Sequence, residues 1–210
     1  MAQANGTERR RRSDGERTRQ AILDTAAQLA TVEGLDGLSL GRLAQETGMS
    51  KSGLFAHFGS KEELQLATIS AAEVVFQADV IGPAMARPEG VARLRALAEG
   101  FLSHVERKVF PGGCFFASAA AELDTRPGPL RDRIAEVYRG WVGLLEESAR
   151  RAQERGELDP ALDPEQVVFE VNAMLAEANG LYILSGDRRA FEMARRAIAA
   201  RIGEETPGAS

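Results

Sequence analysis

A short segment between Ser50 and Lys61 concentrates the side chains of this chain that could do chemistry. On a helix that starts after Ser50, Leu54 and Phe58 lie on one apolar face. The residues left on the outer face are Lys51, Ser52, Gly53, Phe55 and His57. Such groups can meet phosphates or base edges in a major groove, and a glycine permits close approach. Ser39 and Ser50 would add hydroxyls at helix starts and Lys61 a cation, so the pattern predicts DNA contact.

These side chains need two short helices held at a fixed angle. Ser39 can cap a first helix that carries Leu43 and ends near Gly48, and Ser50 can cap the second. The layout predicts a helix-turn-helix over residues 39–58, with Leu43, Leu54 and Phe58 in the core. The alternative is a purely structural helical pair, in which Phe55 packs in the core and His57 only ends a helix.

The charge of the chain is unevenly distributed. The 210 residues contain 26 Lys+Arg and 31 Asp+Glu, for a net charge of −5, yet Arg9 to Arg12 form an uninterrupted basic run. Arg17 and Arg19 follow at the start of the first expected helix, where we expect contact with DNA phosphates. A basic front on an acidic body indicates a local polyanion-binding surface. The alternative is a solvated, disordered leader.

The remaining sequence predicts an all-α fold of about nine helices, because apolar residues recur at helical spacing and no strand alternation is present. We expect a first helix over residues 13–33 and another from Lys61 to Ile81, opened by the capping box at Ser60 and broken by Gly82-Pro83. Pro129 and Asp163-Pro164 mark later helix starts.

Composition excludes several classes of protein. With Cys114 as the one cysteine and two histidines, neither an intrachain disulfide nor a common Cys/His zinc site is possible. We expect no metal, no cofactor, no membrane span and a cytoplasmic location. For catalysis, the one plausible nucleophile is Cys114 and its one partner His104, separated by Pro111-Gly112-Gly113, so no enzyme activity or catalytic residue is expected.

Residues 37–64, and more broadly about residues 16–76, resemble the DNA-binding domain of the tetracycline-repressor (TetR) family. The specific elements are Gly48-Met49-Ser50, Leu54-Phe55-Ala56-His57-Phe58, Lys61 and Leu64. The resemblance implies a homodimeric, ligand-responsive transcription factor, usually a repressor, that a small molecule releases from a near-palindromic operator. A DNA-binding regulator without a small-molecule ligand, constitutive or controlled by a partner, is the alternative.

The resemblance also implies roles for individual residues. Ser39 and Lys61 would contact phosphates, Lys51, Ser52 and Gly53 bases or phosphates, and Phe55 and His57 the backbone or base edges. Phe55 stands where the family usually has tyrosine, so a hydroxyl contact to phosphate is missing, and Ala56 replaces a frequent aromatic residue. The implied organisation is a disordered basic leader (1–14), a DNA-binding domain (15–76), a ligand-binding and dimerisation domain (77–203) and a disordered tail (204–210).

By the same analogy, an apolar effector pocket lies among the middle helices. Its candidate lining residues are Phe76, Phe101, His104, Cys114, Phe115, Tyr138, Trp141 and Met174. Ordinary core packing is the alternative for each. At an expected helix start, the dipole would lower the pKa of the Cys114 thiol and make it a candidate sensor, whereas the alternative is a small buried apolar residue.

The last two helices predict a dimer surface. One stripe of the first comprises Val167, Val171, Met174, Ala178 and Leu181, and a second comprises Val168, Leu175 and Tyr182. We expect one stripe to pack on the domain and the other on a partner chain. The face with Phe191, Ala194, Ile198 and Ile202 would complete a four-helix interface.

Overall fold

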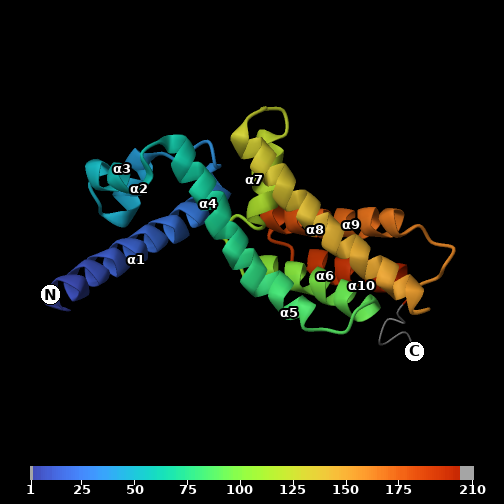
Figure 1. Cartoon of the computed structure of the whole chain (residues 1–210). Helices are drawn as coiled ribbons and strands as arrows, with labels where there is room; N and C mark the ends of the chain where they lie inside the picture. The colour runs from blue at the N-terminus through green and yellow to red at the C-terminus, as the bar shows by residue number, and fades with distance from the viewer. Residues whose placement is uncertain (1, 204–210) are drawn as a thin grey trace.

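The computed structural model describes residues 2–203, and side chains from Asp14 onward. Within that range the chain is helical and contains no β-strand. The elements are α1 (Ala2–Glu33), α2 (Leu40–Thr47), α3 (Lys51–Phe58), α4 (Lys61–Phe76), the π-helix η1 (Gln77–Ile81), α5 (Gly82–Met85), α6 (Val91–Glu106), α7 (Phe115–Leu123), α8 (Pro129–Glu154), α9 (Pro164–Ser185) and α10 (Arg189–Arg201). Because α4, η1 and α5 form one uninterrupted rod, the described residues form nine continuous helices, as predicted (Figure 1).

The N-terminal helices form a small head around a shared apolar core. Ile22 and Ala26 of α1 are buried together with Leu43 of α2, Leu54 of α3 and Leu64 of α4. Figure 1 shows α2 and α3 beside α1, with α4 leading away toward the remaining helices. The head therefore fixes where α3 points.

The expected disordered leader differs from the structure, in which α1 is continuous from Ala2 to Glu33. Residues 8–12 are Glu and Arg, both good helix formers, so they can extend the helix toward the N-terminus. The first helix therefore begins eleven residues before the expected Ser13. The expectation for residues 204–210 lies outside the described residues.

The rod that starts at Lys61 does not break at Gly82-Pro83 as expected. The N–H of Gly82 donates to the carbonyl of Gln77, five residues earlier, which makes the turn before Pro83 a π turn. A proline ring clashes with the carbonyl four residues before it in a regular α-helix, and a wider turn relieves that clash. The rod consequently continues to Met85.

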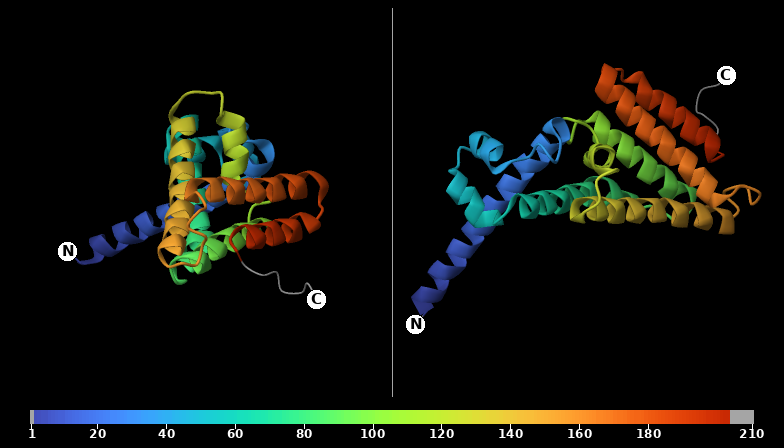
Figure 2. Two further views of the ribbon diagram at one scale, coloured as in Figure 1. Left: turned by 90° about the vertical axis from the view of Figure 1, so that its right-hand side faces the viewer. Right: turned by 90° about the horizontal axis from the view of Figure 1, so that it is seen from above.

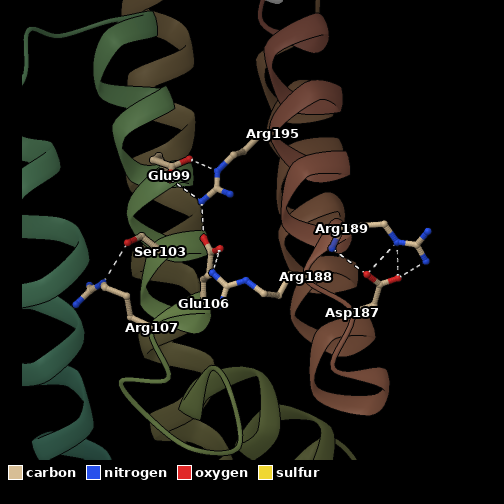
Figure 3. Close-up of polar contacts among 8 residues, drawn as sticks. All are labelled: Glu99, Ser103, Glu106, Arg107, Asp187, Arg188, Arg189 and Arg195. Carbon is tan, nitrogen blue, oxygen red and sulfur yellow. Dashed lines mark hydrogen bonds and ion pairs between the residues drawn. The ribbon is translucent and has the colours of Figure 1, made fainter.

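The C-terminal helices pack as a body around one end of this rod. Helices α9 and α10 lie side by side and form one outer layer (Figure 2). Arg195 of α10 bonds Glu99 at 2.8 Å and Glu106 at 2.9 Å, both on α6 (Figure 3). Arg188 also donates to Glu106, at 2.6 Å. These contacts clamp α10 onto α6.

Head and body are joined by backbone that packs without space for a side chain. A Cβ on Gly112, in the loop before α7, would lie 1.8 Å from the carbonyl oxygen of Thr31 in α1. The Gly112 N–H donates to the Thr31 hydroxyl at 3.1 Å, and Gln28 donates to the Val109 carbonyl at 3.0 Å. The end of α1 is thus held against the body.

Two segments, Lys61–Met85 and Pro164–Ser185, are long and apolar enough to match a membrane span by length and composition. We expected no membrane span from the sequence, because charged residues interrupt the apolar runs. Side chains of both helices lie in the protein core, including Leu64, Ile69, Val171 and Leu175. Packing within the chain accounts for the buried part of each segment, which is 44% of the apolar 18-residue window in the first and 39% of that in the second.

Candidate nucleic-acid interface and adjoining cavity

Helices α2 and α3 are joined by a tight turn at Gly48, whose φ of 67° is in the left-handed region that favours glycine. The hydroxyl of Ser39 accepts from the N–H of Arg42, and the hydroxyl of Ser50 accepts from the N–H of Gly53. Both serines therefore cap helices, as predicted. The caps fix where α2 and α3 begin.

The two faces of α3 separate as its sequence pattern predicts. Leu54 is fully buried and Phe58 is 3% exposed, whereas Phe55 is 56% exposed. The alternative that Phe55 packs in the core is wrong. This aromatic ring at the centre of the outer face leaves a large apolar surface that the described residues do not cover.

The polar residues of that face surround the Phe55 ring. Lys51 and Ser52 are exposed, and the Ser52 hydroxyl lies 3.1 Å from that of Ser50. Gly53 and His57 are half-buried. This face offers a cation, hydroxyls and an imidazole on one helical surface, which are groups that bind phosphates and base edges.

Two predicted contact residues have partners within the chain. The Lys61 ammonium donates to the carbonyl of Asp36 at 2.6 Å and to its carboxylate at 3.2 Å. The Arg19 guanidinium lies 5.0 Å from the centre of the Phe58 ring, in cation–π geometry. Lys61 therefore ties α4 to the loop before α2, and Arg19 braces the end of α3.

A cavity of about 90 Å³ lies between the rod and helices α6 to α9. Its lining includes five of the predicted residues, namely Phe76, Phe101, Cys114, Tyr138 and Trp141. Sequence reasoning missed Asn172, which also lines it and accepts from the Trp141 indole N–H at 2.9 Å. Only the fold brings these two residues together, because 31 positions separate them.

Three predicted pocket residues lie elsewhere. Phe115 is buried against Phe110 and Phe116, outside the cavity lining. Met174 faces an apolar groove between α9 and α10. His104 is 1% exposed, and its Nδ1 lies 2.7 Å from the Asp79 carboxylate. Helical spacing does not distinguish these positions from cavity-facing ones, because neighbouring faces of one helix are equally apolar.

Cys114 occupies the N-cap position of α7 without a capping hydrogen bond from the helix to its side chain, and it is buried. Burial raises the pKa of its thiol, and the backbone N–H groups of Ala117 and Phe116 only partly oppose that effect. The expectation of a lowered pKa is therefore wrong. A buried neutral thiol favours the alternative of a small apolar residue over a sensor.

We expected one apolar stripe of α9 to be buried in the domain and the other to be exposed for a partner chain, but the structure buries residues of both stripes. Val167, Val171 and Ala178 are buried together with the second stripe of α9, and so is the apolar face of α10. The groove between the two helices instead exposes Phe169 (70%) and Met193 (45%), and it also includes Met174 and Leu181. Apolar residues surround α9 on most sides, so its sequence could not specify which stripe remains outside.

A carboxylate on α7 connects the body with the head. Glu122 accepts the backbone N–H of Leu35 at 2.7 Å and that of Asp36 at 2.6 Å. Asp36 in turn holds Lys61, and hydrogen bonds from Lys61 and Arg126 lower the pKa of its carboxyl. Because α7 also contributes Phe116 and Ala117 to the cavity lining, one short helix contacts both the cavity and the loop that holds Lys61. The sequence contains no local signal for this contact.

Family models match both halves of the chain. The model described as "Bacterial regulatory proteins, tetR family" matches residues 22–68, and "Tetracyclin repressor-like, C-terminal domain" matches residues 90–198. The chain belongs to the TetR family. It is accordingly a helix-turn-helix transcriptional regulator. Separately, the described residues contain no cluster of three or more His, Cys, Asp or Glu that could hold a metal ion.

Individual TetR-family proteins agree with this assignment. The transcriptional regulator LmrA of Bacillus subtilis is 29% identical over 139 residues, covering 64% of this chain and 72% of LmrA. A TetR regulator from Chloroflexus aurantiacus superposes with a TM-score of 0.84 at 26% identity, covering 92% of this chain and 98% of that one. AibR, solved with isovaleryl coenzyme A and operator DNA, gives a TM-score of 0.71 at 26% identity, covering 87% and 96%.

Proposed function

We propose that the chain is a homodimeric, ligand-responsive repressor that binds a near-palindromic operator through α3 and leaves it when a small molecule fills the cavity. One observation carries the proposal. The rod begins with α4 at Lys61, separated from the helix-turn-helix by two residues, and reaches the cavity wall at Phe76. A displacement at the cavity therefore has a rigid route to the head.

The DNA contacts in this proposal come from the outer face of α3. Lys51, Ser52 and Phe55 are exposed there, with Gly53 and His57 beside them, and Ser39 and Ser50 present helix N-termini to phosphates. Arg19 and Lys61 contribute positive charge at the flank. Arg9 to Arg12, at the start of α1, would reach a minor groove or flanking phosphates.

The partner in the homodimer is proposed to cover the groove between α9 and α10. The exposed side chains of Phe169 and Met193 give the groove an apolar surface. Ala173 and Ala197 allow close approach. A two-fold dimer would place two α3 helices about 34–36 Å apart, one turn of DNA. A monomer at micromolar concentration by light scattering would contradict this part.

Release follows from linkage if the ligand has a higher affinity for the arrangement that cannot bind DNA than for the one that can. That AibR was solved with both isovaleryl coenzyme A and operator DNA supports a ligand for this chain as well. The alternative, a regulator without a small-molecule ligand, shares the DNA contacts. Either protein would act in the cytoplasm, where bacterial DNA is accessible.

The proposal is tested by selecting DNA from a random duplex pool with the purified full chain. The affinity for the selected DNA is then measured at two salt concentrations. We expect an enriched near-palindrome bound by a dimer with a steep salt dependence, because phosphate contacts release counterions. Absence of any enriched sequence would overturn DNA recognition by α3. Operator binding that no small molecule changes would favour the ligand-free alternative.

A further inference from the structure

The polar groups of the cavity form a single chain of hydrogen bonds. The Trp141 indole N–H donates to Asn172 Oδ1 at 2.9 Å, and Asn172 Nδ2 donates to the Tyr138 hydroxyl at 2.8 Å. All three residues line the cavity, and its remaining lining is apolar or aromatic apart from the buried Cys114 thiol.

The direction of this chain is set by Trp141. An indole N–H can only donate, so the amide oxygen of Asn172 must face it and the amide nitrogen must face Tyr138. The Tyr138 oxygen therefore accepts, and its own proton remains available. Among the described residues, no acceptor bonds this hydroxyl proton. Tyr138 is 47% exposed and also lines the adjoining groove, so water can accept this proton in the free protein and a ligand acceptor would replace that water.

Charge around the cavity disfavours an anion. No Lys or Arg lines it, and burying an unpaired charge is costly. An adjoining open groove shares Tyr138 and Asn172 and carries the carboxylates of Glu146, Asp163 and Glu165. The interior holds no carboxylate, so a cation would be buried without a partner as well. A neutral ligand fits best.

The size and walls of the cavity suit one ring. Phe76 packs edge-to-face with Phe101 at 6.4 Å, Phe116 at 5.8 Å and Trp141 at 5.4 Å between ring centroids. A further aromatic ring can join such an arrangement favourably. The volume is about 90 Å³, below the roughly 150 Å³ of an apolar cavity that binds benzene, so the space admits no more than one ring.

We propose that the cavity binds an uncharged single-ring compound that carries a hydrogen-bond acceptor, such as an aryl carbonyl, with the acceptor on the Tyr138 hydroxyl. The regulatory meaning of this site rests on the proposed function, but binding itself does not. The proposal names the chemical class of the ligand and assigns Tyr138 as its polar anchor.

Acetophenone, ethylbenzene and benzoate are the probes that test this inference on the full-length protein. Trp141 is the one tryptophan of the chain, so its indole N–H gives a single NMR cross-peak that reports cavity occupancy during a titration. We expect acetophenone to shift this peak saturably. Benzoate at the same concentrations should leave it in place, and equal or tighter binding of benzoate would overturn the requirement for a neutral ligand.

The Tyr138→Phe variant keeps the ring and removes the donor. It should weaken acetophenone binding about three- to tenfold, the effect of one hydrogen bond, and leave ethylbenzene within about twofold. Tyr182→Phe is the matched control, because Tyr182 is the other tyrosine and packs on Phe191 away from the cavity. If Tyr138→Phe changes the affinities for acetophenone and ethylbenzene equally, or changes neither, the assignment of Tyr138 is overturned.

Operator release, measured separately, distinguishes this inference from the proposed function. Acetophenone that occupies the cavity without weakening operator binding would support the ligand class and overturn ligand-responsive regulation through this site. Release by benzoate together with a saturable shift of the Trp141 peak would overturn the neutral ligand class and leave a ligand-responsive regulator.

Discussion

Asp79 Oδ2 lies 2.7 Å from His104 Nδ1, so a carboxylate in the π turn of the rod holds a buried imidazole of α6. The same carboxylate accepts from Arg107 at 2.7 Å. Burial opposes the ionisation of Asp79, but the hydrogen bonds from Arg107 and His104 outweigh it and hold its pKa below the ordinary value. Asp79 therefore fastens the irregular part of the rod to its neighbour.

Replacing Asp79 with alanine should lower the free energy of unfolding by about 1–3 kcal/mol, because the buried His104 Nδ1 loses its acceptor. Urea denaturation followed by circular dichroism measures the change. Asp132→Ala is the control: its carboxylate is 76% exposed at the start of α8 and should matter little. Equal stability of the two variants would contradict the role of Asp79.

Stability should fall as the pH drops from 7.5 to 5.5. Burial lowers the pKa of His104 despite the Asp79 carboxylate, so the folded chain resists protonation there. The unfolded chain takes up that proton near the ordinary value of about 6.5, and acid consequently favours unfolding below it. Urea titrations at the two pH values should show a smaller drop in the free energy of unfolding for His104→Gln than for the unmodified protein. An identical drop in both proteins would exclude His104 as the cause.

Adjacent positions on α3 should separate stability from DNA affinity. Leu54→Ala removes a fully buried side chain and should cost about 2–5 kcal/mol of unfolding free energy. Phe55→Ala removes an exposed ring and should stay within about 0.5 kcal/mol, while its affinity for the selected operator falls. Thermal denaturation and fluorescence anisotropy measure the two properties. Full operator affinity in Phe55→Ala would remove this ring from the interface.

The Cys114 thiol should resist modification in the folded protein. Its burial and raised pKa leave little accessible thiolate. A thiol-reactive chromogenic disulfide should therefore label the native chain only after denaturant is added. An Ala121→Cys variant supplies an exposed thiol on the same helix and should react at once. Rapid labelling of the unmodified chain would revive the sensor hypothesis.

Much of the local structure could be predicted because its causes are local. Ser39, Ser50, Ser60 and Asp163 all accept backbone N–H groups at helix starts, and each was identified from a few neighbouring residues. The buried positions of Leu43, Leu54 and Phe58 followed from helical spacing in the same way.

Other features depend on which helices meet and could not be predicted. Glu122 reaches Leu35 across 87 positions, and Asn172 reaches Trp141 across 31. The pKa of Cys114 required knowledge of burial, which outweighs the effect of a helix start. The choice of exposed stripe on α9 likewise depends on the neighbours of that helix.

Replacing Glu122 with glutamine tests whether α7 holds the loop before α2 against the body. A neutral amide offers one acceptor where two N–H groups are held, so unfolding free energy should fall by about 1–3 kcal/mol. Glu154→Gln, in a surface ion pair on α8, is the control and should change it little. Urea denaturation decides between them, and unchanged stability in Glu122→Gln would exclude a structural link.

The contact of Gly112 with Thr31 limits how this regulator can be recombined with others. A hybrid that takes its head from one protein and its body from another must keep two backbones in register where no side chain fits. Any residue other than glycine at this position would push the end of α1 away and carry α2 and α3 with it. Exchanges made at the α4 boundary alone should therefore yield misaligned chimeras, whereas those that transfer residues 109–112 with α1 preserve the joint.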